Sequence, residues 1–182
     1  ESALFHTWCA NWAMDAAAAE GSAPWIIVGI DHLPGRFDEY TPFPYTWRPF
    51  RPRGKLMLEC FAEHIKPFVD NTYRTQPEPR HTAVVGASLG GLMALYMGRM
   101  RPDVIGRMGA VSATLQWSDE AIFELWSSKL PAWTKIWLDC GSEERIWLED
   151  LFLDYPSFIQ RFHDKLAELG YGPPELRLEL ED

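Results

Sequence analysis

The stretch Val84-Val85-Gly86-Ala87-Ser88-Leu89-Gly90-Gly91 decides the expected fold of this chain. A short β-branched run leads into Gly-x-Ser-x-Gly, and an apolar helical segment follows at once. A serine placed between a strand and a helix in this way sits on a strained turn, which exposes its hydroxyl to a reactant. The pattern therefore predicts that Ser88 acts as a nucleophile.

The neighbours of Ser88 fit that chemistry. We expect glycine at Gly86 and Gly90 because a Cβ atom at either position would clash where the strand and the helix nearly touch. Gly91 should let the helix pack closely on the sheet. The backbone N–H of Leu89, together with the N-terminus of the helix, is expected to stabilise a developing oxyanion.

The same stretch does not fit a nucleotide-binding loop. A dinucleotide fingerprint needs a glycine where Ser88 stands, and a Walker A loop ends in Gly-Lys-Ser or Gly-Lys-Thr. Neither pattern occurs at residues 86–91. Nucleotide binding is therefore disfavoured.

The composition narrows the class of protein. A chain of 182 residues suits one domain with a substantial core. The net charge of −9 argues against nucleic acid and anionic membranes as partners. Nine Trp, ten Phe and six Tyr suggest a pocket with aromatic walls. No run reaches the ~18 apolar residues of a membrane span, and no signal peptide is visible, so a cytoplasmic setting is expected.

No cofactor is expected from the sequence. The three cysteines, Cys9, Cys60 and Cys140, are too few and too scattered for a disulfide framework. No cluster of His, Cys and Asp has the spacing of metal ligands. We therefore expect neither a metal nor another cofactor.

Strands and helices alternate along the chain. Strands are predicted at 25–31, 82–88, 108–113 and 135–141, with an edge strand at 176–180. Helices are predicted at 8–20, at 57–68, from Ser88 to about Arg101, at 119–128 with Ser118 as its cap, and at 156–169. The face of helix 57–68 is expected to consist of Met57, Cys60, Phe61, His64, Ile65 and Phe68. This order predicts an α/β fold with a mostly parallel sheet and helices on both faces.

Residues 32–53 form the longest segment without a regular pattern. It holds five prolines and six aromatic residues, so it cannot be regular structure. A long irregular loop in a compact domain is usually functional or disordered. Because it leaves the predicted strand at 25–31 from its carboxyl end, we expect an ordered flap that borders the Ser88 pocket.

A serine nucleophile needs a histidine base and a carboxylate that orients it. On a hydrolase sheet the chain order is serine, acid, histidine. The acid normally follows a later strand, here 135–141, which makes Glu144 the first choice. Asp139 and Glu143 remain alternatives.

The base has no good candidate in the chain. The only histidine after Glu144 is His163, which lies in the middle of a predicted helix rather than in the loop after the last strand. The other four precede Ser88, which is the wrong order; they are His6, His32, His64 and His81.

Five ordered motifs now point to a family. They are 28–31 (Val-Gly-Ile-Asp), 36–42 (Arg36 with Glu-Tyr-Thr-Pro), 65–75 (Ile-Lys-Pro-Phe-Val-Asp with Tyr-Arg-Thr), 85–92 (Val-Gly-Ala-Ser-Leu-Gly-Gly-Leu) and 138–141 (Leu-Asp-Cys-Gly). Together they resemble the Putative esterase family, which includes esterase D, enterochelin esterases and feruloyl esterases. The resemblance implies an α/β-hydrolase fold and ester cleavage through an acyl-enzyme. By this resemblance, Ser88 is expected to be the nucleophile and Glu144 the acid.

The chain also departs from that family. Members have an Asp-Gly-Gln-Asn-like loop before the first helix, which helps to form the oxyanion hole, and a Gly-Gly-x-His loop after the final strand, which supplies the base. We therefore expect residues 1–182 to form a single α/β-hydrolase domain, truncated at both ends, that lacks the N-terminal strands and the C-terminal histidine loop. The stretch 112–117 resembles the family's Ser-Pro-Ser-x-x-Trp, so Gln116 and Trp117 are expected to line the substrate pocket.

Two classes of function follow from these observations. The first is a serine hydrolase that cleaves a small-molecule carboxylic ester. The second is a non-catalytic α/β-hydrolase-like binding module, or an inactive fragment without its histidine. The sequence leaves the identity of the ester and the oligomeric state open.

Overall fold

The computed structural model describes residues 8–45, 51–148 and 151–181, and the chain divides into two compact units, 1–35 and 36–182. The first unit contains one described helix, α2 (Ala10–Ala19). A glycine with positive φ, Gly21 at +91°, follows it, as expected for a helix that ends there. The predicted helix at 8–20 is confirmed, with a later start.

The predicted strand at 25–31 is wrong. The structure assigns no strand to these residues, and no ladder of the described chain includes them. A continuous apolar run gives a segment the propensity to be a strand, but only hydrogen bonds to a neighbouring strand make it one.

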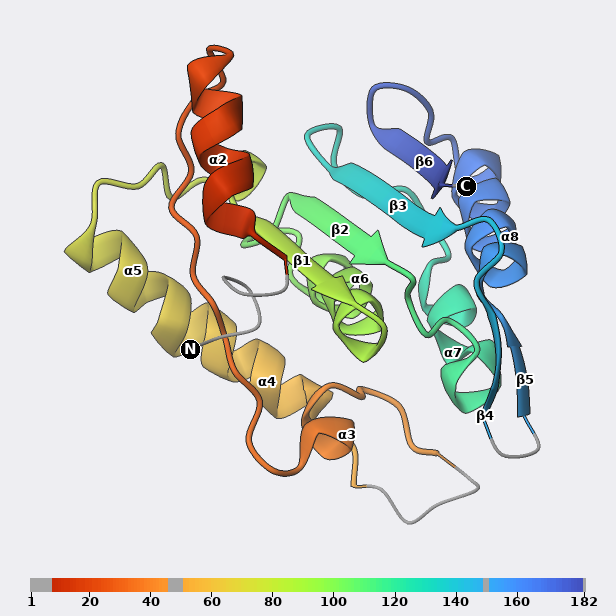
Figure 1. Cartoon of the computed structure of the whole chain (residues 1–182). Coiled ribbons are helices and arrows are strands. Elements are labelled where there is room, and N and C mark those ends of the chain that lie inside the picture. Colours follow the sequence, from red (N-terminus) through yellow and green to blue (C-terminus); the bar gives the residue numbers. More distant parts are fainter. Residues whose placement is uncertain (1–7, 46–50, 149–150, 182) are drawn as a thin grey trace. The chain divides into compact units, whose positions relative to one another are not determined.

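The second unit contains the sheets and most of the helices (Figure 1). In chain order its elements are α3 (Arg36–Glu39), α4 (Gly54–Cys60), the π-helix η1 (Phe61–Ile65), α5 (Lys66–Thr72), the 3-10 helix η2 (Pro79–His81), β1 (Ala83–Ala87), α6 (Leu89–Met100), β2 (Arg107–Val111), α7 (Trp117–Leu125), β3 (Lys135–Gly141), β4 (Arg145–Leu148), β5 (Leu151–Asp154), α8 (Tyr155–Glu168) and β6 (Leu176–Glu181). No helix in the described part of the chain is long and apolar enough to cross a membrane.

The main sheet has the order β1-β2-β3-β6, and every pair in it is parallel. The predicted parallel sheet is thus confirmed, and β3 has the predicted bounds. Because all four strands run the same way, their carboxyl ends meet at one edge of the sheet, where ligands bind in open α/β sheets.

Within residues 36–182, α6 and α8 cover the same face of this sheet. The register aligns Met108, Ile136 and Leu176 on one face. Gly98 of α6 lies so close to Met108 that a Cβ atom would come within 2.1 Å of its sulfur. At the other side, α8 contacts β3 and β6 and buries Ile159 and Phe162. Helix α7 contacts both helices: it touches α6, and Trp126 at its end packs on Phe162 of α8.

The segment α4–η1–α5 is one continuous helix, which confirms the prediction at 57–68. Its predicted face is partly wrong, because Cys60 is exposed and Phe68 is 66 % exposed. The buried side chains are Phe61, which was predicted, and Leu58 and Ala62, which were not. Apolar residues flank Phe61 on both sides of the helix, so periodicity alone did not decide which side would be covered.

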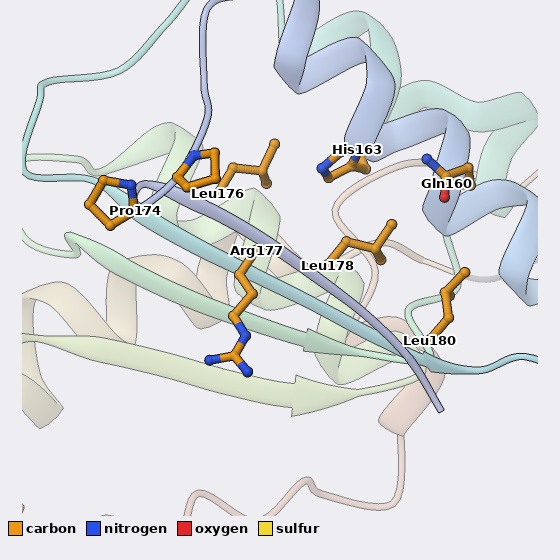
Figure 2. A pocket seen from close by; sticks show the side chains of 8 residues that line it. Gln160, His163, Pro174, Leu176, Arg177, Leu178 and Leu180 are labelled. Carbon is orange, nitrogen blue, oxygen red and sulfur yellow. The ribbon is translucent and has the colours of Figure 1, made fainter. Parts of the chain in front are cut away.

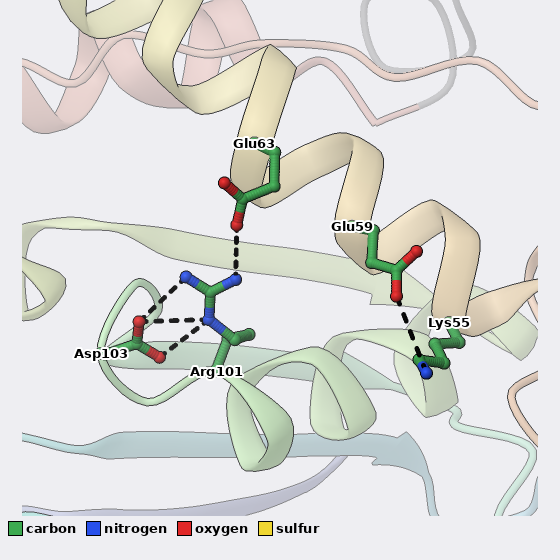
Figure 3. Close-up of polar contacts among 5 residues, drawn as sticks. All are labelled: Lys55, Glu59, Glu63, Arg101 and Asp103. Atoms are coloured by element: carbon green, nitrogen blue, oxygen red, sulfur yellow. Dashed lines mark hydrogen bonds and ion pairs between the residues drawn. The ribbon is translucent and has the colours of Figure 1, made fainter.

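The π-turn lies directly before Pro67. Proline has no N–H to donate to the preceding turn, and a wider π-turn is one way in which a helix accommodates such a break. Arg101, which follows α6, binds Glu63 of η1 at 2.9 Å and Asp103 at 2.9 Å (Figure 3). The pair with Glu63 joins the long helix to the end of α6.

One feature was not predicted, and the predicted helix cap at Ser118 is wrong. Strands β4 and β5 form an antiparallel hairpin directly after Glu144. Ser118 does not cap α7, because the helix begins at Trp117 and Ser118, Asp119 and Glu120 have positive φ values of 54°, 54° and 64°. Arg161 of α8 holds Glu120 through two hydrogen bonds of 3.0 and 2.6 Å, so a contact between distant segments supports this turn.

Candidate active site

Ser88 lies at the turn between β1 and α6, with φ 57° and ψ −122°. This conformation is strained for a residue with a side chain, and such strain is typical of a nucleophile turn. The Ser88 N–H donates to Val111 O at 3.0 Å, and Ser88 O accepts from Gly91 N and Leu92 N at 3.0 and 3.1 Å. The predicted strand–turn–helix placement of Ser88 is confirmed.

The three glycines around Ser88 differ in what they make possible. A Cβ atom on Gly86 would lie 2.4 Å from the carbonyl carbon of Gly90, so only glycine fits there. A Cβ atom on Gly91 would lie 2.9 Å from Ala113 Cβ, which agrees with the predicted close packing. The expectation for Gly90 is wrong: nothing among the described atoms lies within 4 Å of its would-be Cβ. Its backbone, not its missing side chain, fills the space above Gly86.

The hydroxyl of Ser88 is hydrogen-bonded to a threonine that the sequence did not single out. Ser88 Oγ and Thr114 Oγ1 are 3.1 Å apart, and the Thr114 N–H donates to Ser88 O at 3.2 Å. Thr114 is 9 % exposed, so its hydroxyl is held at the inner side of the turn. The only signal in the sequence was its place in the stretch 112–117, just after a predicted strand.

Leu89 is the first residue of α6. The first N–H groups of a helix have no acceptor within the helix, and the helix dipole makes this end partly positive. The N–H of Leu89 is thus suited to accept negative charge near Ser88, although its role as an oxyanion donor stays a prediction.

Glu144 follows β3 at the same edge of the sheet as Ser88. Ser112 Oγ donates to Glu144 Oε2 at 2.5 Å, and the Gly141 N–H and Cys140 Sγ approach the same oxygen at 3.4 and 3.5 Å. Ser112 directly follows Val111, whose carbonyl receives the Ser88 N–H. The end of β2 therefore lies between Glu144 and Ser88 and is hydrogen-bonded to both, through Ser112 and Val111.

The other two carboxylates have different surroundings. The Glu143 side chain is 91 % exposed and pairs with Arg145. Asp139 faces Glu179 and Glu181, and the ligand atoms of these three lie within 4.8 Å of one another. Burial raises the pKa of Asp139, and the negative charges of Glu181, Glu179 and Glu144 raise it further. Three carboxylates could hold a metal ion, but exposed acidic groups of this kind are common without one.

The aromatic segment, residues 37–45 of the predicted flap, packs on Trp117. Phe37 and Tyr45 stack on its ring with centroids 6.3 and 4.4 Å away, and Trp117 Nε1 donates to Phe43 O at 3.3 Å. The Trp117 N–H bonds to Thr114 O at 3.3 Å, so these rings lie one turn of chain from the Ser88 partner. Residues 46–50 of the predicted flap lie outside the described residues, and 32–35 belong to the other unit.

The two predicted pocket residues are placed differently. Trp117 is only 7 % exposed, because the aromatic segment covers it. The Oε1 atom of Gln116 is buried and accepts no hydrogen bond from the described residues. Their role in binding a substrate stays a prediction.

None of the histidines described in residues 36–182 binds Ser88. His163 lies on α8, with its Nδ1 3.2 Å from Asp164 Oδ1, beside β6 (Figure 2). Strand β6 is three strands from β1, roughly 14 Å across the sheet. His64 is exposed on η1, and His81 precedes β1 at the opposite end from Ser88. His32 belongs to the other unit, and His6 lies outside the described residues.

The sequence matches a known family over most of its length. A family model described as Putative esterase matches residues 2–157. The chain belongs to the Putative esterase family. The resemblance that the motifs carried is thus confirmed.

Individual relatives agree with this. The uncharacterized protein YbbA of Bacillus subtilis is 26 % identical over 161 residues, which are 86 % of this chain and 64 % of YbbA. Among solved structures, the BES protein from Bacillus cereus has a TM-score of 0.74 at 17 % identity, over 98 % of this chain and 71 % of that one. The siderophore hydrolase EstA from Aspergillus nidulans has a TM-score of 0.69 at 19 % identity, over 98 % and 72 %.

These similarities establish the fold. The parallel sheet with its helices is an α/β-hydrolase fold, shared with these two proteins. The chain spans 64 % of the length of its curated relative.

Proposed function

We propose that this protein hydrolyses a carboxylic ester through an acyl-enzyme formed on Ser88. The observation that carries the proposal is the strained position of Ser88 between β1 and α6, in a chain of the Putative esterase family. This position presents a hydroxyl at the carboxyl edge of a parallel sheet, beside the N-terminus of a helix.

The proposed reaction has two halves. Ser88 Oγ attacks the ester carbonyl and loses its proton to a histidine, and the negative charge that develops on the carbonyl oxygen is stabilised by the N–H of Leu89. The protonated histidine then gives its proton to the departing alcohol. Water, activated by the same histidine, cleaves the acyl-enzyme and restores the Ser88 hydroxyl.

Glu144 is the acid in this proposal. Its three donors among the described residues all approach Oε2, which leaves Oε1 to accept the N–H of an imidazole. The hydrogen bond from Ser112 fixes the direction of the carboxylate toward the side on which Ser88 lies. Glu143 is directed into solvent, and Asp139 faces two other carboxylates.

The base is assigned to a histidine outside residues 36–182, which by chain order follows β6. The histidines described in this unit lie elsewhere, and Ser88 Oγ is bonded to Thr114. In the proposal, this threonine holds the Ser88 hydroxyl in place at the side opposite to the base.

The substrate is proposed to be a small-molecule ester. Solved structures with the same fold include the siderophore hydrolase EstA and an enterobactin esterase from Shigella flexneri. The rings stacked on Trp117 offer an apolar wall for such a molecule. These rings lie one turn of chain from Thr114, since the Trp117 N–H donates to Thr114 O.

The hydrolysis of p-nitrophenyl acetate tests the proposal with three proteins: residues 1–182, a chain extended into the downstream coding sequence, and the extended chain with Ser88→Ala. We expect turnover in the extended chain and its loss in the alanine variant. Loss of one triad member costs on the order of 10⁴- to 10⁶-fold in turnover, so residues 1–182 should be nearly inactive. Full activity of residues 1–182 would mean that a histidine already present is the base.

The second candidate function is a non-catalytic binding module. It is favoured by one observation, the pairing of Ser88 Oγ with Thr114 instead of a histidine. Turnover that is unchanged by Ser88→Ala, or absent from the extended chain, would place the binding module ahead of the hydrolase.

A further inference from the structure

Strand β6 forms the outer edge of the main sheet in residues 36–182. A groove of about 780 Å³ runs beside it under α8, and Figure 2 shows its lining. Leu176, Leu178 and Leu180 form the apolar side of this groove, and Leu180 is 43 % exposed. An open strand edge beside an apolar groove is a surface on which another strand can pair.

The outer edge of β6 carries free backbone groups. The Ile136 N–H donates to Glu175 O and the Ser142 N–H donates to Glu181 O. Since a residue in a parallel ladder directs its N–H and C=O to the same side, the odd-numbered residues of β6 face β3. Leu178 and Leu180 therefore direct their N–H and C=O groups away from the sheet. In the part of the chain that the structure describes, no strand pairs with them.

The sequence of β6 is complementary to itself. It reads Leu176-Arg177-Leu178-Glu179-Leu180, with a positive and a negative residue at equal distances from Leu178. If a second copy runs antiparallel about a twofold axis at Leu178, each Arg177 lies opposite Glu179 of the second copy. The leucines then face leucines along the whole strand.

The directions of the backbone N–H and C=O groups of β6 agree with this register. With the axis at Leu178, the outward groups of Leu178 meet those of the second copy in a hydrogen-bonded pair. Arg177 and Glu179 then form a non-hydrogen-bonded pair, in which opposing side chains come closest. An axis at Glu179 would set two glutamates against each other, and an axis at Arg177 would oppose two arginines. Like charges directly opposite are unfavourable, so both of these axes are disfavoured. Of the other axes that the backbone directions allow, one at Leu180 would oppose Glu179 and Glu181. An axis at Leu176 would set Leu178 against Pro174, which has no N–H to donate.

We propose that two copies of this chain associate through β6, antiparallel about Leu178, so that the two sheets become one continuous sheet. The interface is isologous, as in most dimers. Arg177 has a 72 % exposed side chain, which contacts Glu179 of its own strand and is free to reach the second copy. The leucines of the second copy cover Leu180 and lie along the open side of the groove.

Sedimentation velocity over a range of protein concentrations tests the proposal. We expect the chain to sediment as a dimer at high concentration. Arg177→Glu and Glu179→Arg should each raise the dissociation constant at least about tenfold, because two attractive pairs become two repulsive ones. Lys55→Glu makes the same change of charge on α4, where the side chain is 77 % exposed, and should leave association unchanged.

A mixture of the two single variants separates pairing between copies from the contact inside one strand. Both variants lose the Arg177–Glu179 contact of their own strand, yet together they restore opposite charges across the axis. An equimolar mixture should therefore dimerise, and so should the double variant Arg177→Glu/Glu179→Arg. Circular dichroism shows whether each variant is folded. If a single variant does not fold, the association of the double variant is compared with that of the wild-type chain.

Three results would overturn the proposal. They are a wild-type chain that stays monomeric at all concentrations, a dimer that neither charge reversal weakens, and a mixture or double variant that fails to associate. A dimer that ignores the charges of β6 would use another surface of the protein.

Discussion

Replacement of Gly86 and Gly90 by alanine should have opposite effects, although both belong to the same Gly-x-Ser-x-Gly motif. The new Cβ of Gly86→Ala would lie 2.4 and 2.5 Å from the carbonyl carbon and oxygen of Gly90. These are backbone atoms at the start of α6, so relief requires the strand and the helix to move apart by roughly 1 Å. Overpacking of this kind costs about 1–3 kcal/mol, occasionally more.

Gly90→Ala is the matched control. Its Cβ would meet no described atom within 4 Å. Alanine in place of a helical glycine lowers the entropy of the unfolded chain, which stabilises a protein by about 0.4–1 kcal/mol. The free energies of unfolding of the two variants should therefore differ by about 1.4–4 kcal/mol.

Urea unfolding followed by circular dichroism measures this difference. With slopes of about 1–3 kcal/mol per molar urea, the midpoints of the two variants should differ by roughly 0.5 M or more. The reasoning is refuted if Gly86→Ala unfolds at the same urea concentration as Gly90→Ala, or later. Equal slopes in both variants are needed for the comparison, because a changed slope indicates a change in the unfolded or native ensemble.

Three further predictions concern titratable groups. Burial and nearby carboxylates raise the pKa of Asp139, so folding favours its protonated form. Asp139→Asn should therefore raise the free energy of unfolding measured in urea at pH 7. This gain should vanish below about pH 4, where Asp139 is protonated in both the folded and the unfolded chain. Arg101 lowers the pKa of Asp103 through a hydrogen bond. Asp103→Asn should therefore lower the free energy of unfolding at pH 7 by less than about 1 kcal/mol, and should have no effect once the pH is below the pKa of Asp103 in the folded protein. A loss of stability that persists at that lower pH would contradict this. Burial, together with the negative charge of Glu144, raises the pKa of the Cys140 thiol to about 12. Iodoacetamide at pH 8 should therefore label Cys60 in the folded protein and leave Cys140 unlabelled until urea is added. Peptide mass spectrometry measures the labelling of each cysteine.

The sequence located the centre of the site well. A β-branched run, two glycines and an apolar helical segment were enough to place Ser88 at the turn between β1 and α6. The bounds of β3 were also predicted correctly, which put Glu144 in the loop at the carboxyl edge of the sheet. Both results depend on local rules of turns and strand ends.

The partners of these residues could not be predicted. Thr114 meets Ser88 and Ser112 meets Glu144 only because the parallel register aligns the ends of β1, β2 and β3. The sequence separation in each pair is 26 and 32 residues, and no local pattern reports a contact at that range. A hydroxyl residue after a strand is too common a feature to be singled out.

The sequence alone determined the class of fold, the position of Ser88 at a strand-to-helix turn, and the family. Each of these depends on patterns within short stretches of the chain. Tertiary structure decided the rest. It made residues 25–31 something other than a strand, chose Leu58 and Ala62 over Cys60 for burial, and showed that Gly86 needs to be glycine while Gly90 does not. In each case the outcome depends on which distant atoms occupy the neighbouring space, and propensity and periodicity do not contain that information.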